Sequence, residues 1–399
     1  VNKNIKVYGF DNDPHKIKKI SQGKSYINYF SDIQIKKMTK KNFKCFLNFE
    51  KIPKVDFIIL CLPTPINKNK SPDLSYIIKT LSKLKKYLRP NQTLSLESTT
   101  YPGTCREIIL PYLKKFDLGK NFFLVYSPER EDPGNKKYSI LKIPKVIGGY
   151  TKKCLEIGAS FYSLLKIKMI KVSSLEAAEL TKLLENIYRS INIGMVNEMK
   201  LLCNKMKINI FEIVNAAKTK PFGYHAFYPG PGYGGHCIPI DPFLLSWKAK
   251  QFNMKTKFIE LSGRINESMP AIIVSKIVAL HKKKIKKTPK ILIIGAAYKK
   301  NVDDIRESPA LKIMNILSKK KINYDYLDPY VKEIKNTRQI NRIKRSITVK
   351  YDLISKYTMS VIVTDHDNLN YSKILKYSNL LLDSRGRYAF NKSEKIIQV

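Results

Sequence analysis

The chain has 399 residues, of which 43% are hydrophobic and 11% aromatic, and its formal net charge at pH 7 is +42. This length allows two or three domains with a large core, and the composition excludes a disordered chain. The longest apolar runs, such as residues 57–62, are far shorter than the roughly 20 residues of a membrane span, and we expect no signal peptide before them. We therefore expect a soluble cytoplasmic protein without a membrane partner.

The large positive charge raises the question of a nucleic-acid partner. Lysines occur throughout the chain, as at residues 16–19, 282–287 and 319–321, and do not follow one helix face with interleaved aromatic residues. Lysine, asparagine and isoleucine are abundant together, which favours compositional drift as the main origin of the positive charge. Binding of an anionic substrate is a second contribution to it. We expect no nucleic-acid partner. The six cysteines show no metal-ligand spacing, so we expect neither a metal site nor a disulfide framework.

Residues 3–10 predict a strand that ends at Asp11, and residues 14–20 begin a helix. A dinucleotide-binding fold uses an acidic residue at such a strand end to bind a ribose hydroxyl, about 20 residues after a G-x-G-x-x-G turn. Only ten residues precede Asp11, and the glycine turn is absent. We therefore expect a first strand, phosphate loop and helix to be missing from this chain. A helix-capping or solvated Asp11 is the alternative.

Further strands are predicted over residues 55–62, 92–97, 121–126 and 145–148, separated by segments of helical period such as 74–88. This alternation indicates a parallel sheet. Because ligands bind at the carboxyl ends of such strands, the loops at 63–65, 98–100 and 127–134 are candidate walls of a site. Each loop taken alone could be an ordinary turn.

A long helix is predicted from residue 174 to about 207, and Ser173 to Glu176 have the spacing of a capping box. Lys182 and Asn186 are four residues apart and project from one face of this helix, which also carries Asn197. Together they could present an ammonium and an amide to one substrate atom. The alternative for Lys182 is an ordinary solvated side chain.

Residues 228–241 contain four glycines and three prolines around Cys237, a composition that fits neither a helix nor a paired strand. Asp241 follows four residues after the cysteine, so a thiol capable of nucleophilic attack has a carboxylate nearby. The alternative is a buried, inert cysteine. Further helices are predicted over 244–252 and 256–280.

A second α/β pattern has strands at residues 289–295, 324–328, 359–364 and 379–383. Its first strand leads into a charged loop before a helix that begins at Ser308 and Pro309. Lys299 and Arg306 in this loop suit phosphate or carboxylate contacts near a helix N-terminus. A charged loop with internal ion pairs is the alternative. The predicted fold is α/β, with two doubly wound Rossmann-like domains joined by a long central helix.

Six motifs, taken in chain order, resemble those of the UDP-glucose/GDP-mannose dehydrogenase family, and the resemblance spans essentially the whole chain. They are Thr64 within Leu-Pro-Thr-Pro, Ser98-Thr99, Ser127-Pro-Glu-Arg130, Lys182-x-x-x-Asn186, residues 232–241 and residues 295–310. Residues 129–134 and 236–242 look most like the branch that oxidises UDP-N-acetylglucosamine at C6. Ile240 stands before Asp241, where the UDP-glucose enzymes usually carry lysine, and this also favours the N-acetyl branch.

The resemblance implies an NAD-dependent, four-electron oxidation of a UDP-sugar C6 alcohol to a carboxylate, in polysaccharide synthesis. It implies that Cys237 forms a thiohemiacetal and then a thioester. Oxyanion stabilisation would come from Lys182 and Asn186, and Lys182 would also favour the cysteine thiolate. Asp241 would orient or deprotonate water, Glu129 would assist hydrolysis, and Thr99 would help to place the water.

By the same resemblance, NAD would be bound by Asp11, Lys16, Thr64, Thr99, Lys299 and Arg306. The UDP-sugar would be bound by Glu129, Arg130, Lys182, Asn186, Tyr228 and Gly234. Members of the family are dimeric through the long helix, so we expect a homodimer. We expect an NAD-binding domain over residues 1–172, a central dimerisation domain with the cysteine loop over 173–270, and a UDP-sugar-binding domain over 271–399.

Three alternatives remain open at this point. The missing glycine turn allows a truncated, catalytically impaired nucleotide-sugar-binding homologue. The same chemistry on UDP-N-acetylmannosamine or UDP-glucose is a second possibility. A basic nucleic-acid-binding protein is a third, disfavoured by the dispersed lysines.

Overall fold

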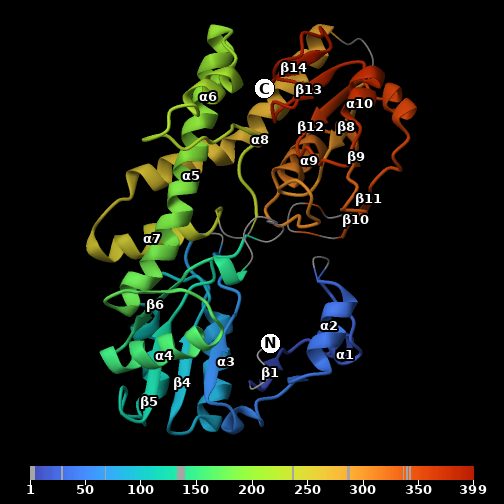
Figure 1. Ribbon diagram of the computed structural model, residues 1–399. Coiled ribbons are helices and arrows are strands. Elements are labelled where there is room, and N and C mark those ends of the chain that lie inside the picture. Colours follow the sequence, from blue (N-terminus) through green and yellow to red (C-terminus); the bar gives the residue numbers. More distant parts are fainter. Residues whose placement is uncertain are drawn as a thin grey trace. The chain divides into compact units, whose positions relative to one another are not determined.

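The computed structural model describes residues 5–27, 30–67, 69–132, 140–235, 238–284, 288–335, 337, 340 and 343–399. The chain forms two compact units. The first comprises Val1–Glu185 with Trp247–Asn253, and the second comprises Asn186–Ser246 with Met254–Val399. The long helix α5 (Leu175–Met206) and the shorter α7 (Asp241–Ala249) each contribute residues to both units. Figure 1 shows α5 as one continuous helix.

The first unit contains two sheets. A two-stranded parallel sheet pairs β1 with β2, and a five-stranded sheet has the order β3-β4-β5-β6-β7. The strands are β1 (Val7–Phe10), β2 (Phe43–Phe46), β3 (Phe57–Leu60), β4 (Gln92–Leu96), β5 (Phe122–Tyr126), β6 (Lys145–Gly149) and β7 (Met169–Lys171). The helices are α1 (Pro14–Ser21), α2 (Asp32–Thr39), α3 (Ser75–Leu84) and α4 (Lys152–Leu164).

The larger sheet of the first unit is covered by α4. Thr151 caps this helix by accepting a hydrogen bond from the N–H of Cys154. Val125 and Ile147 from the sheet pack with Tyr162 from α4 in one buried cluster. All five residues of β4 and of β5 are buried, as expected for strands with both faces covered.

The strand positions agree with the sequence prediction, but the direction of β6 does not. β3, β4 and β5 run parallel, whereas β6 runs antiparallel to β5 and β7 is again parallel to β6. A parallel neighbour requires a crossover back to the starting edge of the sheet, usually through a helix. The described residues between β5 and β6 contain only a short 3-10 turn, Ile140–Lys142, so β6 returns antiparallel.

The second unit contains a five-stranded parallel sheet with the order β14-β13-β12-β8-β9. Its strands are β8 (Lys290–Ile294), β9 (Asn323–Leu327), β12 (Met359–Ile362), β13 (Leu381–Asp383) and β14 (Ile396–Gln398), with a short antiparallel pair β10 (Glu333–Ile334) and β11 (Lys344–Arg345) beside it. Its helices are α6 (Ile210–Ala217), α8 (Lys257–Lys284), α9 (Pro309–Lys319) and α10 (Tyr371–Tyr377).

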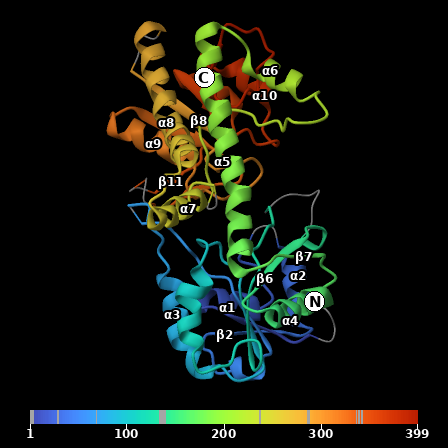
Figure 2. The same cartoon turned by 90° about the vertical axis from the view of Figure 1, so that its left-hand side faces the viewer.

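Alternate residues of β8 face opposite sides of this sheet. Ile291 and Ile293 pack with residues of α8 and α9, which lie side by side along one face (Figures 1 and 2). Leu292 and Ile294 pack on the other face with α10 and the 3-10 helix Tyr351–Lys356. This is the period-two alternation of a strand buried on both sides. The prediction of two Rossmann-like domains with a long central helix is confirmed.

Two details of the helices differ from the sequence prediction. The cap of α5 is Ser174, whose hydroxyl accepts a hydrogen bond from the N–H of Ala177, so the capping-box reading that began at Ser173 was wrong by one residue. The helix predicted near residue 244 begins at Asp241.

None of the helices in the described part of the chain is long and apolar enough to cross a membrane.

Candidate functional site

The loop predicted to carry the nucleophile is described up to Gly235 and again from Ile238, so Cys237 lies outside the described residues. Gly232 has φ +104°, where side chains are strained. An added Cβ at Gly234 would lie 2.7 Å from Cβ of Tyr298 and 3.0 Å from the carbonyl oxygen of Glu307. The N–H of Gly235 donates to the carbonyl of Arg306 at 2.9 Å. The glycines therefore allow the loop to pack closely on residues 298–307.

Asn186 and Asp241 form a buried pair in the second unit. The Nδ2 of Asn186 donates to the Oδ2 of Asp241 at 2.5 Å, and the two residues are 0% and 2% exposed. Arg189, which the sequence reasoning missed, donates to the Oδ1 of Asn186. The amide of Asn186 is thus held by one partner on each side. The available signal for Arg189 was its spacing of one helical turn from Asn186.

Lys182 precedes Asn186 by one turn on α5 and is 5% exposed. Within the described ranges, no carboxylate or carbonyl pairs with its ammonium group. Farther along the helix, Asn197 accepts a hydrogen bond from the N–H of Gly230 at 2.9 Å and donates to the Oδ1 of Asn266 at 2.8 Å. Asn197 therefore attaches the glycine-rich loop to the long helix, a structural role that the sequence did not specify.

The carboxyl ends of β3 and β4 are joined by side-chain hydrogen bonds in the first unit. The hydroxyl of Thr64 donates to the carbonyl of Thr99 at 2.6 Å, and the Oγ of Ser98 accepts from the N–H of Leu62 at 2.8 Å. Thr64 is buried and Thr99 is half-buried. The hydroxyl of Thr100 is buried without a partner among the described residues. Two of the three predicted loops thus lie together at one sheet edge.

The third predicted loop carries Glu129 and Arg130. The Oε1 of Glu129 accepts the N–H groups of Arg130 and Glu131 at 2.7 and 2.8 Å, which fixes the carboxylate over its own loop. The Oε2 lies 3.4 Å from the ammonium of Lys145. Arg130 pairs with Glu185 at 2.7 Å and donates to the carbonyl of Pro144 at 2.6 Å. The guanidinium is therefore anchored within the first unit.

Asp11 follows β1 directly, as predicted. Its Oδ2 lies 3.2 Å from the ammonium of Lys16, and its Oδ1 accepts the N–H of Asp13 at 2.9 Å. The hydrogen bond that Lys16 donates to Asp11 is the main cause that raises the pKa of Lys16. About a third of the Asp11 side chain remains exposed. A carboxylate in this position fits the contact with an adenosine ribose hydroxyl, and Lys16 fits a neighbouring anionic oxygen.

Lys299 is half-buried, and Arg306 is exposed and forms a fork-shaped pair with Asp304. The alternative of a charged loop with internal ion pairs is thus partly correct for Arg306. Tyr228, predicted to contact the sugar, donates to the Oδ1 of Asn215 on α6 at 2.8 Å.

Asp328 and His366 form a buried pair that the sequence reasoning missed, and this pair binds the backbone of the charged loop that follows β8. Asp328 accepts the N–H groups of Ala296 and Ala297, and also bonds to Nε2 of His366 at 2.9 Å. The Nδ1 of His366 accepts the N–H of Asn301 at 2.9 Å, so the proton of the neutral ring is on Nε2. Although burial acts to raise the pKa of Asp328, the bonds from His366 and the backbone leave it below its ordinary value.

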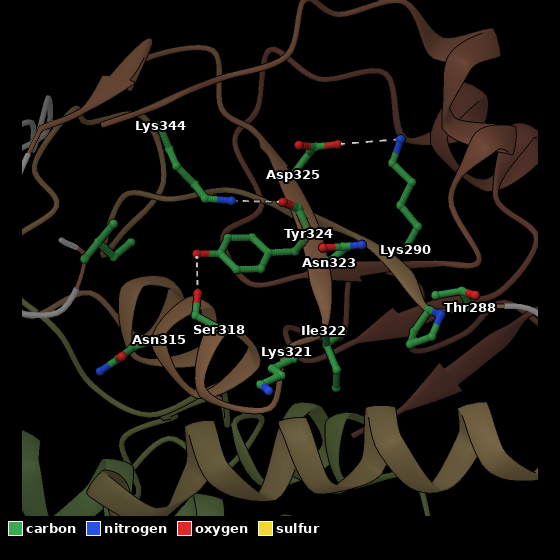
Figure 3. A pocket seen from close by; sticks show the side chains of 12 residues that line it. Thr288, Lys290, Asn315, Ser318, Lys321, Ile322, Asn323, Tyr324, Asp325 and Lys344 are labelled. Atoms are coloured by element: carbon green, nitrogen blue, oxygen red, sulfur yellow. Dashed lines mark hydrogen bonds and ion pairs between the residues drawn. The ribbon is translucent and has the colours of Figure 1, made fainter. Parts of the chain in front are cut away.

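A cavity of about 1040 Å³ lies at the opposite, amino-terminal edge of the same sheet (Figure 3). There the ammonium of Lys344 donates to the carbonyl of Tyr324 at 3.0 Å, and Lys290 lies 3.9 Å from Asp325. Ligands of doubly wound sheets bind at the carboxyl ends of strands, where the predicted site residues lie. We therefore do not assign the reaction to this cavity. In the described ranges no group of three His, Cys, Asp or Glu residues could hold a metal ion.

Comparison with known proteins identifies the family. The NAD-binding domain of the UDP-glucose/GDP-mannose dehydrogenase family matches residues 1–166, the central domain matches 176–268 and the UDP-binding domain matches 292–389. The chain belongs to this family. It is an oxidoreductase, an NAD-dependent nucleotide-sugar 6-dehydrogenase.

Individual relatives of the dehydrogenase differ in the sugar that their names carry. The UDP-N-acetyl-D-glucosamine 6-dehydrogenase of Pseudomonas aeruginosa is 33% identical over 82% of this chain and 78% of its own length. The UDP-N-acetyl-D-mannosamine dehydrogenase of Methanococcus vannielii is 31% identical over 81% of this chain and 72% of its own. The structure of the UDP-D-ManNAc dehydrogenase of Pyrococcus horikoshii superimposes with a TM-score of 0.88 at 28% identity, covering 99% of this chain and 93% of that one.

These comparisons also bear on the expected truncation. All three family domains are matched, and the NAD-binding domain is present. They give no support to the expectation of a missing first strand, phosphate loop and helix, or of an impaired homologue. The dehydrogenase uses NAD, and Asp11 and Lys16 fit that cofactor as described above.

Proposed function

We propose that the dehydrogenase oxidises the C6 alcohol of UDP-N-acetylglucosamine to a carboxylate in four electrons, for surface polysaccharide synthesis. The observation that carries the proposal is the buried pair of Asn186 and Asp241, with Lys182 one turn away on the same helix. The amide and the carboxylate are partners of each other, whereas no carboxylate or carbonyl of the described residues pairs with the ammonium of Lys182. A substrate oxygen or a cysteine thiolate would be a partner of the right charge for this ammonium.

Cys237 is the covalent group of the proposed mechanism. As a thiolate it adds to the C6 aldehyde and forms a thiohemiacetal, and the second oxidation leaves a thioester on the same sulfur. Lys182 stabilises the thiolate and, with the Asn186 amide, the developing oxyanion. Asp241 orients or deprotonates water, with its own carboxylate held by Asn186. Glu129 assists the hydrolysis.

NAD, when bound, accepts a hydride in each of the two oxidations. The residues that would hold it are Asp11 and Lys16 after β1, and Thr64 and Thr99 at the ends of β3 and β4. Thr99 also helps to place the water. Lys299 and Arg306 are proposed to lie near the cofactor, and Arg130, Tyr228 and Gly234 to contact the nucleotide sugar.

The choice of N-acetylglucosamine rests on motifs. Ile240 before Asp241 and the sequence 129–134 favour the N-acetyl branch. Identity to relatives does not separate the two N-acetyl sugars: the Pseudomonas relative named for UDP-N-acetylglucosamine is 33% identical, and relatives named for UDP-N-acetylmannosamine are 31% and 35% identical. UDP-N-acetylmannosamine and UDP-glucose are the alternative substrates.

We also propose a cytoplasmic homodimer that associates through α5, with domains over residues 1–172, 173–270 and 271–399. Exposed apolar side chains recur along this helix at spacings of three, four or seven residues and form an exposed apolar stripe. They are Leu180, Leu184, Tyr188, Met195, Met199, Leu202 and Met206. Sedimentation of Met199→Lys as a monomer, and of the parent as a dimer, would support this proposal; a monomeric parent would contradict it.

The deciding experiment measures NADH production with UDP-N-acetylglucosamine, UDP-N-acetylmannosamine and UDP-glucose. We expect two NADH per molecule of UDP-N-acetylglucosamine, and loss of the second oxidation in Cys237→Ser. Cys45→Ser, a half-buried cysteine on β2, serves as the matched control. If Cys237→Ser completed both oxidations at the parent rate, the thioester mechanism would be wrong. NADH from only one of the other sugars would overturn the substrate assignment alone.

A further inference from the structure

Lys145, the first residue of β6, lies buried between two carboxylates of the first unit. The residue is 8% exposed. Its ammonium lies 2.9 Å from the Oε2 of Glu97, 3.4 Å from the Oε2 of Glu129 and 3.4 Å from the carbonyl of Pro128. An ammonium has three donors, so each donor has one acceptor. The side chain therefore has a single defined orientation.

Glu97 is buried, and both of its carboxylate oxygens accept hydrogen bonds from protein side chains. The hydroxyl of Tyr162 donates to the Oε1 of Glu97 and lies 3.0 Å from the hydroxyl of Ser95. The Glu97 side chain is only 9% exposed. Burial, followed by the charge of Glu97, raises the pKa of Tyr162, so its hydroxyl keeps its proton. Glu97 and Tyr162 thus form a fixed support for the lysine.

Glu129, the second carboxylate beside Lys145, is exposed to solvent. The Glu129 side chain is 44% exposed, and its Oε1 is occupied by two backbone N–H groups of its own loop. Its Oε2 faces Lys145. The ammonium of Lys145 gives this second oxygen a charged donor at 3.4 Å. Lys145 therefore acts together with the two backbone N–H groups in orienting the carboxylate of Glu129.

We propose that Lys145 is a positioning residue for Glu129 during hydrolysis of the thioester, an inference that rests on the proposed function. In this step the oxygen of water attacks the acyl carbon, and its proton passes to Glu129. The carbon–sulfur bond breaks and its electron pair leaves on the sulfur, which releases the carboxylic acid and the thiolate of Cys237. The acid then loses its remaining proton to solvent and becomes the carboxylate, and no oxidation or reduction takes place. Lys145 holds Glu129 so that its Oε2 can accept that proton.

The competing explanation is that Lys145 only neutralises Glu97 inside the domain. Lys145→Met alone would not separate the two, because it would leave Glu97 buried without a cation and could unfold the domain. The double variant Glu97→Gln/Lys145→Met removes both charges and keeps the hydrogen bond from Tyr162. It is compared with Glu97→Gln alone, and Lys153→Met, an exposed lysine of α4, is the control for loss of charge.

The assay mixes each variant with NAD and UDP-N-acetylglucosamine and follows NADH and the intact mass of the enzyme. Relative to Glu97→Gln, the double variant is expected to release its first two NADH per site within twofold of the same rate. Its steady turnover is expected to be about tenfold slower, as loss of a hydrogen bond to a charged group implies. A covalent adduct with the mass of the acyl group should accumulate. A lysine with only a structural role would instead lower the burst and the steady rate together.

Glu129→Gln distinguishes the failure of this inference from failure of the proposed function. If the acyl-enzyme adduct accumulates in Glu129→Gln and in the double variant, the result supports both the proposed function and the role of Lys145. If the adduct accumulates in Glu129→Gln but not in the double variant, the role of Lys145 is wrong and the proposed function is unaffected. If Glu129→Gln accumulates no adduct, the hydrolytic role of Glu129 is wrong, and the role of Lys145 is wrong with it.

Discussion

Lys200 on α5 provides a quantitative test of the second unit. It is fully buried, and its ammonium donates to the carbonyl of Ser384 at 3.1 Å. Burial lowers the pKa of Lys200 from its ordinary 10.5 to about 7, while Asp383 acts to raise it and Arg385 acts to lower it. Because one pKa unit corresponds to about 1.4 kcal/mol, the buried charge costs about 5 kcal/mol below pH 7.

The sign of the pH dependence follows from the two pKa values. Below pH 7 Lys200 is protonated in both states, so the folded chain bears the full cost. Between pH 7 and 10.5 the unfolded chain binds a proton that the folded chain has lost, so stability rises with pH. Integration over pH 7 to 9.5 gives a gain of about 3 kcal/mol. Lys200→Met, which has similar volume and no charge, should remove this gain.

We expect Lys200→Met to be stabilising relative to the parent at pH 7, by about 3 kcal/mol more than at pH 9.5. Pulse proteolysis in urea measures the free energy of unfolding at both pH values. Lys205→Met, at an exposed lysine five residues farther along the same helix, controls for the change in net charge. A difference between variant and parent that is equal at both pH values, within about 1 kcal/mol, would refute the reasoning.

Two further substitutions test the packing and the buried charges. Gly234→Ala should lower the melting temperature and the activity together, because the added Cβ would lie 2.7 Å from Cβ of Tyr298. Such overpacking costs about 1–3 kcal/mol of stability. An unchanged unfolding transition in calorimetry would contradict this prediction. Burial raises the pKa of Glu179 from 4.5 to about 7, so the parent should lose about 3 kcal/mol of stability as pH rises through that window. Glu179→Gln should flatten that part of the profile, and a parallel profile would show that Glu179 does not titrate there.

The strands and long helices were predictable because burial on both faces leaves a continuous apolar run between turn residues. The helix predicted over 174–207 is observed as Leu175–Met206, and the strand predicted over 121–126 as Phe122–Tyr126. The direction of β6 was not predictable, since it depends on the path of the connection and not on composition. The helix Lys152–Leu164 was missed, although Thr151 before it is an ordinary capping residue.

The candidate site was predictable as a set of residues but not as a set of bonds. Lys182 and Asn186 are on one helix, and their spacing alone indicates a common face. The hydrogen bond between Asn186 and Asp241 joins residues 55 positions apart. It depends on α7 beginning at Asp241, which the sequence placed three residues later. Arg189 and Lys145 were missed because a charged residue on a helix or at a strand start is usually solvated.

The buried lysines of this chain differ in whether a protein group pairs with their charge. Among the described residues four lysines are less than 9% exposed: Lys145, Lys182, Lys200 and Lys248. Three of them have a carboxylate or carbonyl acceptor. Lys182, which is 5% exposed, has no such acceptor in the described ranges. Its ammonium is therefore the one of these four that a substrate oxygen or the thiolate of Cys237 could bind without displacing a carboxylate or carbonyl of the described residues, which is the role proposed for it above.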